Sequence, residues 1–277
     1  MAHIWDLQAW GPPRGYFPEP TKSILVVPPR NVAQSEELFW GIGIKVVMGH
    51  RYIGGLIGES EAEKRCLAGK VTGWAESVET HAGVSRKHPQ SACAGLQKSL
   101  QQEWVFLQRV TPGIGNAFGP VEKVLRDTFV QALFEGLGEG APERVVIRLP
   151  VKQAGLALLY PTLMAPENWT ASCVITGHLI AELRGQVEFR TSDCSACLRE
   201  GLTAVWRQSQ HRAEEALAAT IAESPVQGAR RLKWETKTGS WLTFKLSTVN
   251  GNDMGAQEWC DALFLRYGLE PPDLPKY

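Results

Sequence analysis

The sequence of 277 residues has no long apolar run, no excess charge and no framework of cysteines. No window approaches about eighteen uninterrupted apolar residues, which excludes a membrane-spanning helix at the level of sequence. Lys plus Arg equals Asp plus Glu at 29 each, so the whole chain lacks the positive charge of strong nucleic-acid-binding proteins. Six scattered cysteines, with no basic and apolar leader before them, predict a reduced, intracellular protein, nuclear or cytoplasmic.

The sequence also lacks the short motifs of several enzyme classes. It contains no Gly-x-Ser-x-Gly, Walker or His-Glu-x-x-His motif. Cys194 and Cys197 have the spacing of a metal or redox pair, but a zinc site needs two more ligands, and the nearest later candidate, His211, stands alone. We interpret the two cysteines as one turn apart on a helix. His178 and His211 are interpreted as single helical histidines, either solvated or satisfied in the core.

Residues 15–58 give the clearest alternation of strand and helix signals. Residues 23–27 and 44–48 are short β-branched runs, and Asn31 can cap a helix between them. A third strand is predicted over 51–53. Connection rules then predict a small mixed sheet with one covering helix.

The rest of the chain has helical periodicity. Hydrophobic residues make up 44% of the sequence, enough for a packed core, and we interpret most of the ten tryptophans as core residues. A short helix is expected within residues 1–14, and 239–244 are expected to be a strand or extended loop. Further helices are predicted over residues 59–82, 89–110, 117–137, 166–183, 193–223, 225–235 and 256–267.

The predicted fold class is therefore α+β, mostly α-helical. Three regions are expected along the chain. Residues 1–58 form the strand–helix–strand–strand part, 59–148 form a bundle of three helices, and 149–277 form a C-terminal helical region.

Two stretches carry a resemblance to a known family. In the first, a Lys-Ser pair leads into the strand at 23–27, and an Arg-Tyr-Ile-Gly sequence follows the second predicted strand. This order resembles the end of the palm in reverse transcriptases of the non-LTR retrotransposon type, where a Tyr-Leu-Gly turn leads to the thumb. The matching residues are Lys22, Ser23, Arg51, Tyr52, Ile53 and Gly54, with Ile53 in the place of leucine.

The second stretch is similar to the Leu-Pro-x-x-x-Gly-Gly-Leu-Gly-Leu segment that follows the thumb in many of these enzymes. Its matching residues are Leu149, Pro150, Gly155 and Leu156. Alanines stand at positions 154 and 157, where the family pattern has glycine. The resemblance implies a palm remnant at 1–58, a thumb at 59–148 and a further helical region, the C-terminal portion of an RNA-directed DNA polymerase.

The resemblance also indicates what this chain does not carry. Family members hold Mg²⁺ with aspartates, including an Asp-Asp hairpin just before the Lys-Ser strand. Here no Asp-Asp pair occurs, and only Asp6 and Glu19 precede Lys22 as acidic residues. Lys22 matches the family lysine that approaches the triphosphate, although we favour an ordinary strand-edge lysine.

We therefore expect a protein that is inactive as a polymerase on its own and has no cofactor of its own. The expected partners are an RNA/DNA primer–template, bound weakly, or the upstream part of a polymerase; no membrane and no small-molecule substrate are expected. The alternative is a stand-alone helical module that binds proteins and has no nucleic-acid role. Salt-dependent binding to an RNA/DNA hybrid distinguishes the two.

Overall fold

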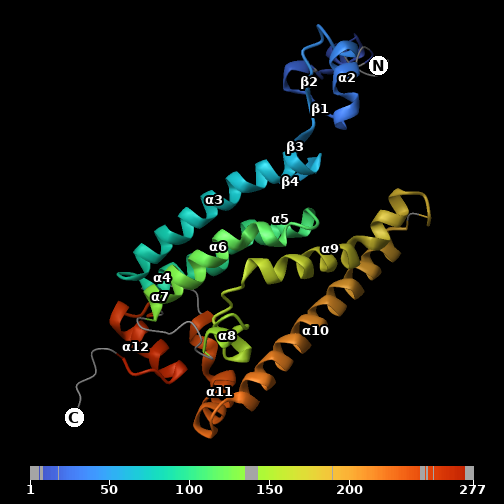
Figure 1. The fold of residues 1–277 in the computed structure, drawn as a ribbon. Helices are drawn as coiled ribbons and strands as arrows, with labels where there is room; N and C mark the ends of the chain where they lie inside the picture. The colour runs from blue at the N-terminus through green and yellow to red at the C-terminus, as the bar shows by residue number, and fades with distance from the viewer. Residues whose placement is uncertain are drawn as a thin grey trace. The chain divides into compact units, whose positions relative to one another are not determined.

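The computed structural model describes residues 6, 9–17, 19–134, 143–188, 190–243, 247, 249–251 and 253–271. The chain divides into two compact units, residues 1–69 and 70–277 (Figure 1). Strands occur only near the N-terminus of the described part and helices make up most of the remainder, so the predicted α+β, mostly helical class is confirmed. The division into three regions stays a prediction, and the helix expected within 1–14 falls largely outside the described residues.

The N-terminal unit begins with a strand–helix–strand arrangement. β1 (Ile24–Val26) pairs in parallel with β2 (Lys45–Val47), so that Ile24 lies opposite Lys45. α2 (Val32–Leu38) connects them, as parallel neighbours require a crossover. Asn31 occupies the N-cap position of α2 without a side-chain hydrogen bond to the helix. The predicted order of strand, helix and strand is confirmed.

A separate hairpin follows. β3 (Gly49–Tyr52) pairs antiparallel with β4 (Gly55–Gly58) through a two-residue turn. In the described residues the strands therefore form two sheets of two strands, and the prediction of one mixed sheet was wrong. The reason is the tight turn, which pairs residues 49–52 with the next residues along the chain instead of with β2.

The helical unit has an aromatic core. α3 (Ser60–Ser85) contributes Trp74, which stacks on Phe118 at 5.9 Å and meets Trp104 edge-on at 6.1 Å between ring centroids. The indole nitrogen of Trp74 donates a hydrogen bond to Glu103 at 2.9 Å. Trp104 and Phe118 come from the next two helical stretches, so this contact joins all three predicted helices.

Each of those two stretches is continuous but contains a π-helical turn. The first consists of α4 (Pro89–Gly95), η4 (Leu96–Leu100) and α5 (Gln101–Val110). The second consists of η5 (Gly115–Phe118), α6 (Gly119–Val124), η6 (Leu125–Phe129) and α7 (Val130–Leu133). The helices predicted over 89–110 and 117–137 are confirmed as far as residue 133; residues 135–137 lie outside the described part.

The C-terminal helices follow the predicted order, with one helix that was not expected, α8. The α-helices are α8 (Glu143–Ile147), α9 (Pro161–Leu183), α10 (Thr191–Glu223), α11 (Val226–Thr238) and α12 (Ala256–Tyr267). Short 3-10 turns occur at η7 (Val151–Gln153) and η8 (Gly239–Thr243). Gly268 ends α12 in the left-handed conformation.

α9 begins five residues earlier than predicted, and Pro166 lies inside it. A carboxylate from α6 accounts for the early start, because Glu122 accepts hydrogen bonds from the backbone N–H and the hydroxyl of Thr162 in the first turn. Pro166 has no N–H to offer the carbonyl of Thr162. Gly115 packs against that carbonyl instead, so closely that a Cβ atom would lie 3.2 Å from its oxygen.

The expectation of a strand or extended loop over 239–244 was wrong. Residues 239–243 form the 3-10 turn η8, and residue 244 lies outside the described part. Gly239 packs on Val151, and Trp241 meets Trp259 edge-on at 6.3 Å. Residues 239–243 have no neighbouring strand with which to form backbone hydrogen bonds, so they form these bonds within a helical turn instead.

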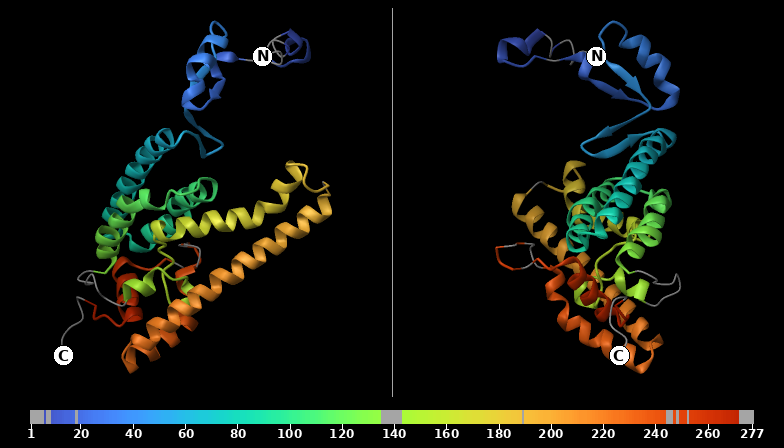
Figure 2. Two further views of the ribbon diagram at one scale, coloured as in Figure 1. Left: turned by 45° about the vertical axis from the view of Figure 1, so that its right-hand side comes forward. Right: turned by 90° about the vertical axis from the view of Figure 1, so that its left-hand side faces the viewer.

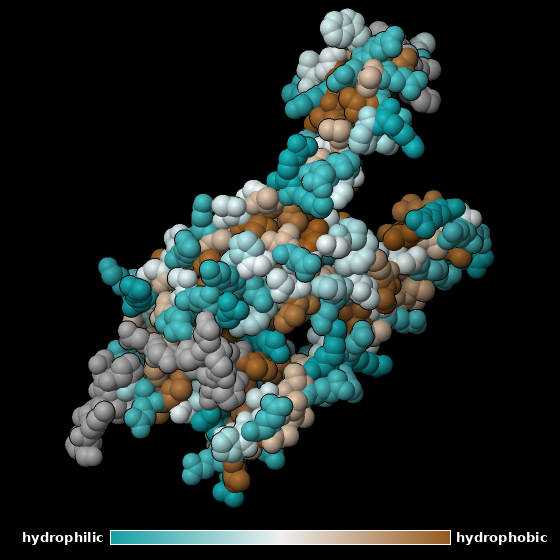
Figure 3. Space-filling view, in the orientation of Figure 1, coloured by the Kyte–Doolittle hydropathy of each residue, from teal (hydrophilic) through white to brown (hydrophobic). Residues whose placement is uncertain are grey.

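α9 and α10 form an antiparallel hairpin, and Figures 1 and 2 show the two helices meeting at one end and diverging away from it. Several large apolar side chains of these two helices are exposed to solvent. Apolar side chains reach the surface near the end of the hairpin (Figure 3), where Leu183 is 79% exposed. Trp206 on α10 is also exposed, as are Trp10, Trp40 and Trp234. In the described part, the buried tryptophans are Trp74, Trp104 and Trp259. The interpretation of most tryptophans as core residues was therefore wrong.

Candidate functional site

Lys22 lies in a turn and not on a strand. It ends the 3-10 turn η2 (Pro20–Lys22), and its ammonium pairs with the carboxylate of Glu19 at 2.6 Å. Its side chain is 78% exposed. Ser23 follows directly and donates from its hydroxyl to the carbonyl of Glu19 at 3.4 Å. The strand-edge interpretation of Lys22 is thus corrected: the proline at 20 starts a turn that places the lysine just before β1.

The Arg-Tyr-Ile-Gly residues form the β3–β4 turn. Arg51 and Tyr52 end β3, and the two central turn positions, Ile53 and Gly54, have φ of 47° and 85°. Two consecutive residues of positive φ are the signature of a type I′ hairpin turn, whose twist matches that of the strands it joins. Tyr52 and Ile53 are both exposed. The structure therefore presents this stretch as a tight, solvent-facing turn.

The second stretch, residues 149–158, is buried at most positions, apart from the exposed Lys152, and has an unusual backbone. Ala154 and Ala157 both have the left-handed backbone conformation, with φ of 66° and 52°. At Gly155 a Cβ atom would lie 1.8 Å from the carbonyl oxygen of Leu149, so no other residue fits that backbone. Leu156 is fully buried.

Side chains from distant helices hold this loop. Gln101 on α5 donates to the carbonyl of Ala157 at 3.1 Å and accepts from the backbone N–H of Leu159 at 2.9 Å. Gln97 donates to the carbonyl of Leu156. From α12, the hydroxyl of Tyr267 donates to the carbonyl of Ala154 at 3.1 Å. Burial raises the pKa of Tyr267 above its ordinary value, so this phenol stays a hydrogen-bond donor even in moderately alkaline solution. The loop is a joint between helices and has no reactive group at its centre.

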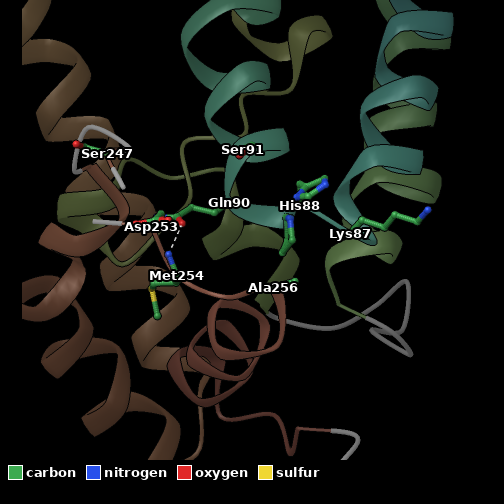
Figure 4. Close-up of a pocket in the computed structure, with 9 residues that line it drawn as sticks. Lys87, His88, Gln90, Ser91, Ser247, Asp253, Met254 and Ala256 are labelled. Carbon is green, nitrogen blue, oxygen red and sulfur yellow. Dashed lines mark hydrogen bonds between the residues drawn. The ribbon is translucent and has the colours of Figure 1, made fainter. Parts of the chain in front are cut away.

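A polar cavity of about 480 Å³ lies where α4 and α12 begin (Figure 4). Gln90 reaches across it and accepts a hydrogen bond from the backbone N–H of Met254 at 2.9 Å, whereas Lys87 extends the opposite way. The N-termini of α4 and α12, together with the cationic side chain of Lys87, would favour a bound anion in this cavity. The carboxylate of Asp253, which also lines the cavity, would repel an anion. The described lining residues are Lys87, His88, Pro89, Gln90, Ser91, Ser247, Asp253, Met254 and Ala256.

The cysteine pair and the histidines lie on the predicted helices. Cys194 and Cys197 are one turn apart on α10, as expected. His211 is exposed, also as expected, with its imidazole 3.3 Å from Glu215. His178 is half-buried, and its Nε2 atom lies 3.2 Å from Oε1 of Glu182. Within the described ranges, no three His, Cys, Asp or Glu side chains are gathered as a metal site in their present conformations.

Glu182 is the residue that sequence reasoning missed. Its side chain is 1% exposed, which is unusual for a carboxylate. Partial desolvation raises the pKa of the neighbouring Cys194 thiol, and the negative charge of Glu182 raises it further. The signal in the sequence was a histidine followed four positions later by a glutamate, which places the two on one helix face.

Comparison with family models, with curated proteins and with solved structures found no match. The roles given to the matching residues by the resemblance stay predictions. Among the helices that the structure describes, none is both long enough and apolar enough to cross a membrane.

Proposed function

We propose that this chain derives from a reverse transcriptase of the non-LTR type, and that its helical unit supports an RNA/DNA duplex as a thumb does. In this proposal the chain contributes no polymerase chemistry by itself. The observation that carries the proposal is the backbone conformation at the positions where the family pattern has glycine.

Those positions are 154, 155 and 157. The backbone is left-handed at Ala154 and Ala157, and it excludes a side chain at Gly155. A left-handed alanine costs about 1 kcal/mol relative to the ordinary conformation, so local preference does not explain it. Hydrogen bonds from Gln101 and Tyr267 hold the loop in this shape. The loop has a backbone conformation that favours glycine, yet alanine stands at two of its positions. This supports descent from the glycine-containing pattern, with alanine replacing glycine at those two positions.

The β3–β4 turn gives the same kind of support. Ile53 is β-branched, and such residues rarely adopt positive φ. The two-residue hairpin requires that conformation, and the family pattern likewise has a large aliphatic residue before its glycine. Both matching stretches therefore use backbone shapes that their own residues do not favour.

The charge of the chain predicts that duplex binding is weak. Equal numbers of acidic and basic residues leave no excess to neutralise many phosphates. We expect fluorescence anisotropy with a labelled RNA/DNA hybrid to show binding at low salt that disappears near physiological salt. Absence of binding even at low salt would contradict the proposal. Primer extension with Mg²⁺ should give no product, and detectable product would overturn the claim that the chain lacks polymerase activity by itself.

A protein-interaction module is the second candidate. It is favoured by the apolar side chains that α9 and α10 expose, namely Leu163, Val174, Leu183, Leu202 and Trp206. This function predicts no hybrid binding at any salt concentration, together with association that depends on an apolar surface. Substitution of Leu183 and Trp206 by glutamine would then abolish that association.

A further inference from the structure

A cavity of about 320 Å³ lies between α9, α10 and the residues on either side of the buried loop at 149–158. The two helices diverge toward the start of α9 (Figure 2), and the cavity lies in that part of the hairpin. Its walls come from the first two turns of α9, from the middle of α10 and from residues 148–150 and 159–160. A volume of this size is at the lower end of the range of small-molecule sites.

Much of the wall is apolar. Leu149 and Leu159 line the cavity from the two ends of the loop, and Leu163 and Met164 line it from α9. Leu163 is 54% exposed, so the cavity is open to solvent on that side. A hydrocarbon group that entered would remove this apolar surface from water, which is favourable.

The charged side chains of the cavity do not balance. Nη1 of Arg212 on α10 pairs with Oε1 of Glu167 on α9 at 2.8 Å, which compensates one positive charge. Arg148, half-buried directly after α8, also lines the cavity, and it has no hydrogen bond or ion pair with any residue in the described ranges. The cavity therefore carries one uncompensated positive charge.

Arg212 has a further unused donor. Its Nε atom is buried and has no hydrogen-bond partner in the described part of the chain, although its Nη1 atom is paired. A buried donor without a partner is costly, and a half-buried guanidinium without a counter-charge is unusual. An anionic group in the cavity would supply acceptors for these donors.

We infer that this cavity binds a small molecule that has a carboxylate group and an apolar body, and that Arg148 recognises the carboxylate. A guanidinium is always protonated and can donate two parallel hydrogen bonds to a carboxylate. The two arginines against one glutamate disfavour a cation. A purely inorganic anion would leave the apolar wall unused.

This site is independent of the proposed duplex binding, because its ligand is not a nucleic acid. It is tested by isothermal titration calorimetry of the full chain with octanoate as the probe. Octanamide is the matched ligand, since it keeps the chain and the polar group but has no charge. We expect one octanoate per chain and at least tenfold weaker binding of octanamide. Absence of octanoate binding, or equal binding of the two ligands, would overturn the proposal.

Two variants locate the site by charge and by volume. Arg148→Gln should weaken octanoate binding at least tenfold, whereas Arg207→Gln, at an exposed position of α10 outside the cavity, should leave it unchanged. Ser209→Trp should abolish binding, because an indole at this exposed lining position would occupy the cavity without disturbing the core. Circular dichroism should show the same helix content in all variants. Octanoate binding that persists at full strength in Arg148→Gln or in Ser209→Trp would overturn the assignment.

Discussion

The loop at 149–158 and the α9–α10 hairpin are held by polar contacts from different sources. In the loop, the carbonyls of Ala154, Leu156 and Ala157 receive hydrogen bonds from side chains on other helices, namely Tyr267, Gln97 and Gln101. In the hairpin, the buried carboxylate of Glu182 keeps one oxygen without a partner. Each place keeps a buried oxygen without a hydrogen-bond partner, Oε1 of Gln153 in the loop and Oε2 of Glu182 in the hairpin. What differs is the source of the contacts: side chains from distant helices hold the loop, whereas Glu182 is held by His178 on its own helix and by the backbone of Arg190.

The largest test of this comparison is Gly155→Val. A Cβ atom at Gly155 would collide with the carbonyl of Leu149, and the loop is held too firmly to yield. We expect the free energy of unfolding to fall by about 4 kcal/mol or more, measured by urea denaturation. Gly177→Ala on α9 is the control, because nothing lies within 4 Å of its missing Cβ; it should stabilise the helix by about 1 kcal/mol. Equal effects of the two would show that the loop is not a rigid joint.

Gln101→Met tests the hydrogen bonds that hold the loop. It removes a donor to Ala157 and an acceptor for Leu159 while keeping the side-chain length. Two backbone groups would lose their partners, which costs about 2–3 kcal/mol of unfolding free energy. Gln102→Met, at an exposed neighbouring position, should change stability by less than about 0.5 kcal/mol. A neutral result at Gln101 would mean that water replaces the side chain.

The pH dependence of the unfolding free energy tests the burial of one thiol, that of Cys93. Cys93, buried on α4, has its pKa raised far above its ordinary value of 9.0 by burial. Above that value the unfolded chain loses the proton while the folded chain keeps it, so stability falls as pH rises, by about 1.4 kcal/mol per pH unit. Denaturation at a series of pH values should show no slope from this thiol near pH 8 and should approach this slope above about pH 10, and Cys93→Ala should reduce it. An identical slope in the variant would assign the effect to other groups.

The smallest expected effect concerns Ala154→Gly and Ala157→Gly. Glycine adopts left-handed conformations without strain, although it has more entropy to lose on folding. We expect each substitution to stabilise the chain by about 0.5 kcal/mol, as measured by the denaturation midpoint. Ala219→Gly, on the exposed face of α10, should instead destabilise by about 1 kcal/mol. Destabilisation at 154 and 157 would contradict the left-handed geometry on which the proposed ancestry rests.

Much of the secondary structure could be predicted because its signal is local. Apolar periodicity gave the helices that became α3, α10 and α12, and the proline-bounded run at 23–27 gave β1. The position of Cys194 and Cys197 on one helix followed from spacing alone. The matching residues of the family pattern could be quoted from the sequence, but the left-handed backbone at Ala154 and Ala157 could not, because alanine does not favour it.

The amino-acid sequence by itself determined the order and type of most elements, since neighbouring residues along the chain decide them. Tertiary structure decided what no local window contains: that Glu122 starts α9 at Pro161, that the strands form two separate sheets, and that Trp206 faces solvent. It also decided that Glu182 is buried across from Cys194. The physical reason is that the partner of a polar group, or the cover of an apolar one, can come from any other element of the fold.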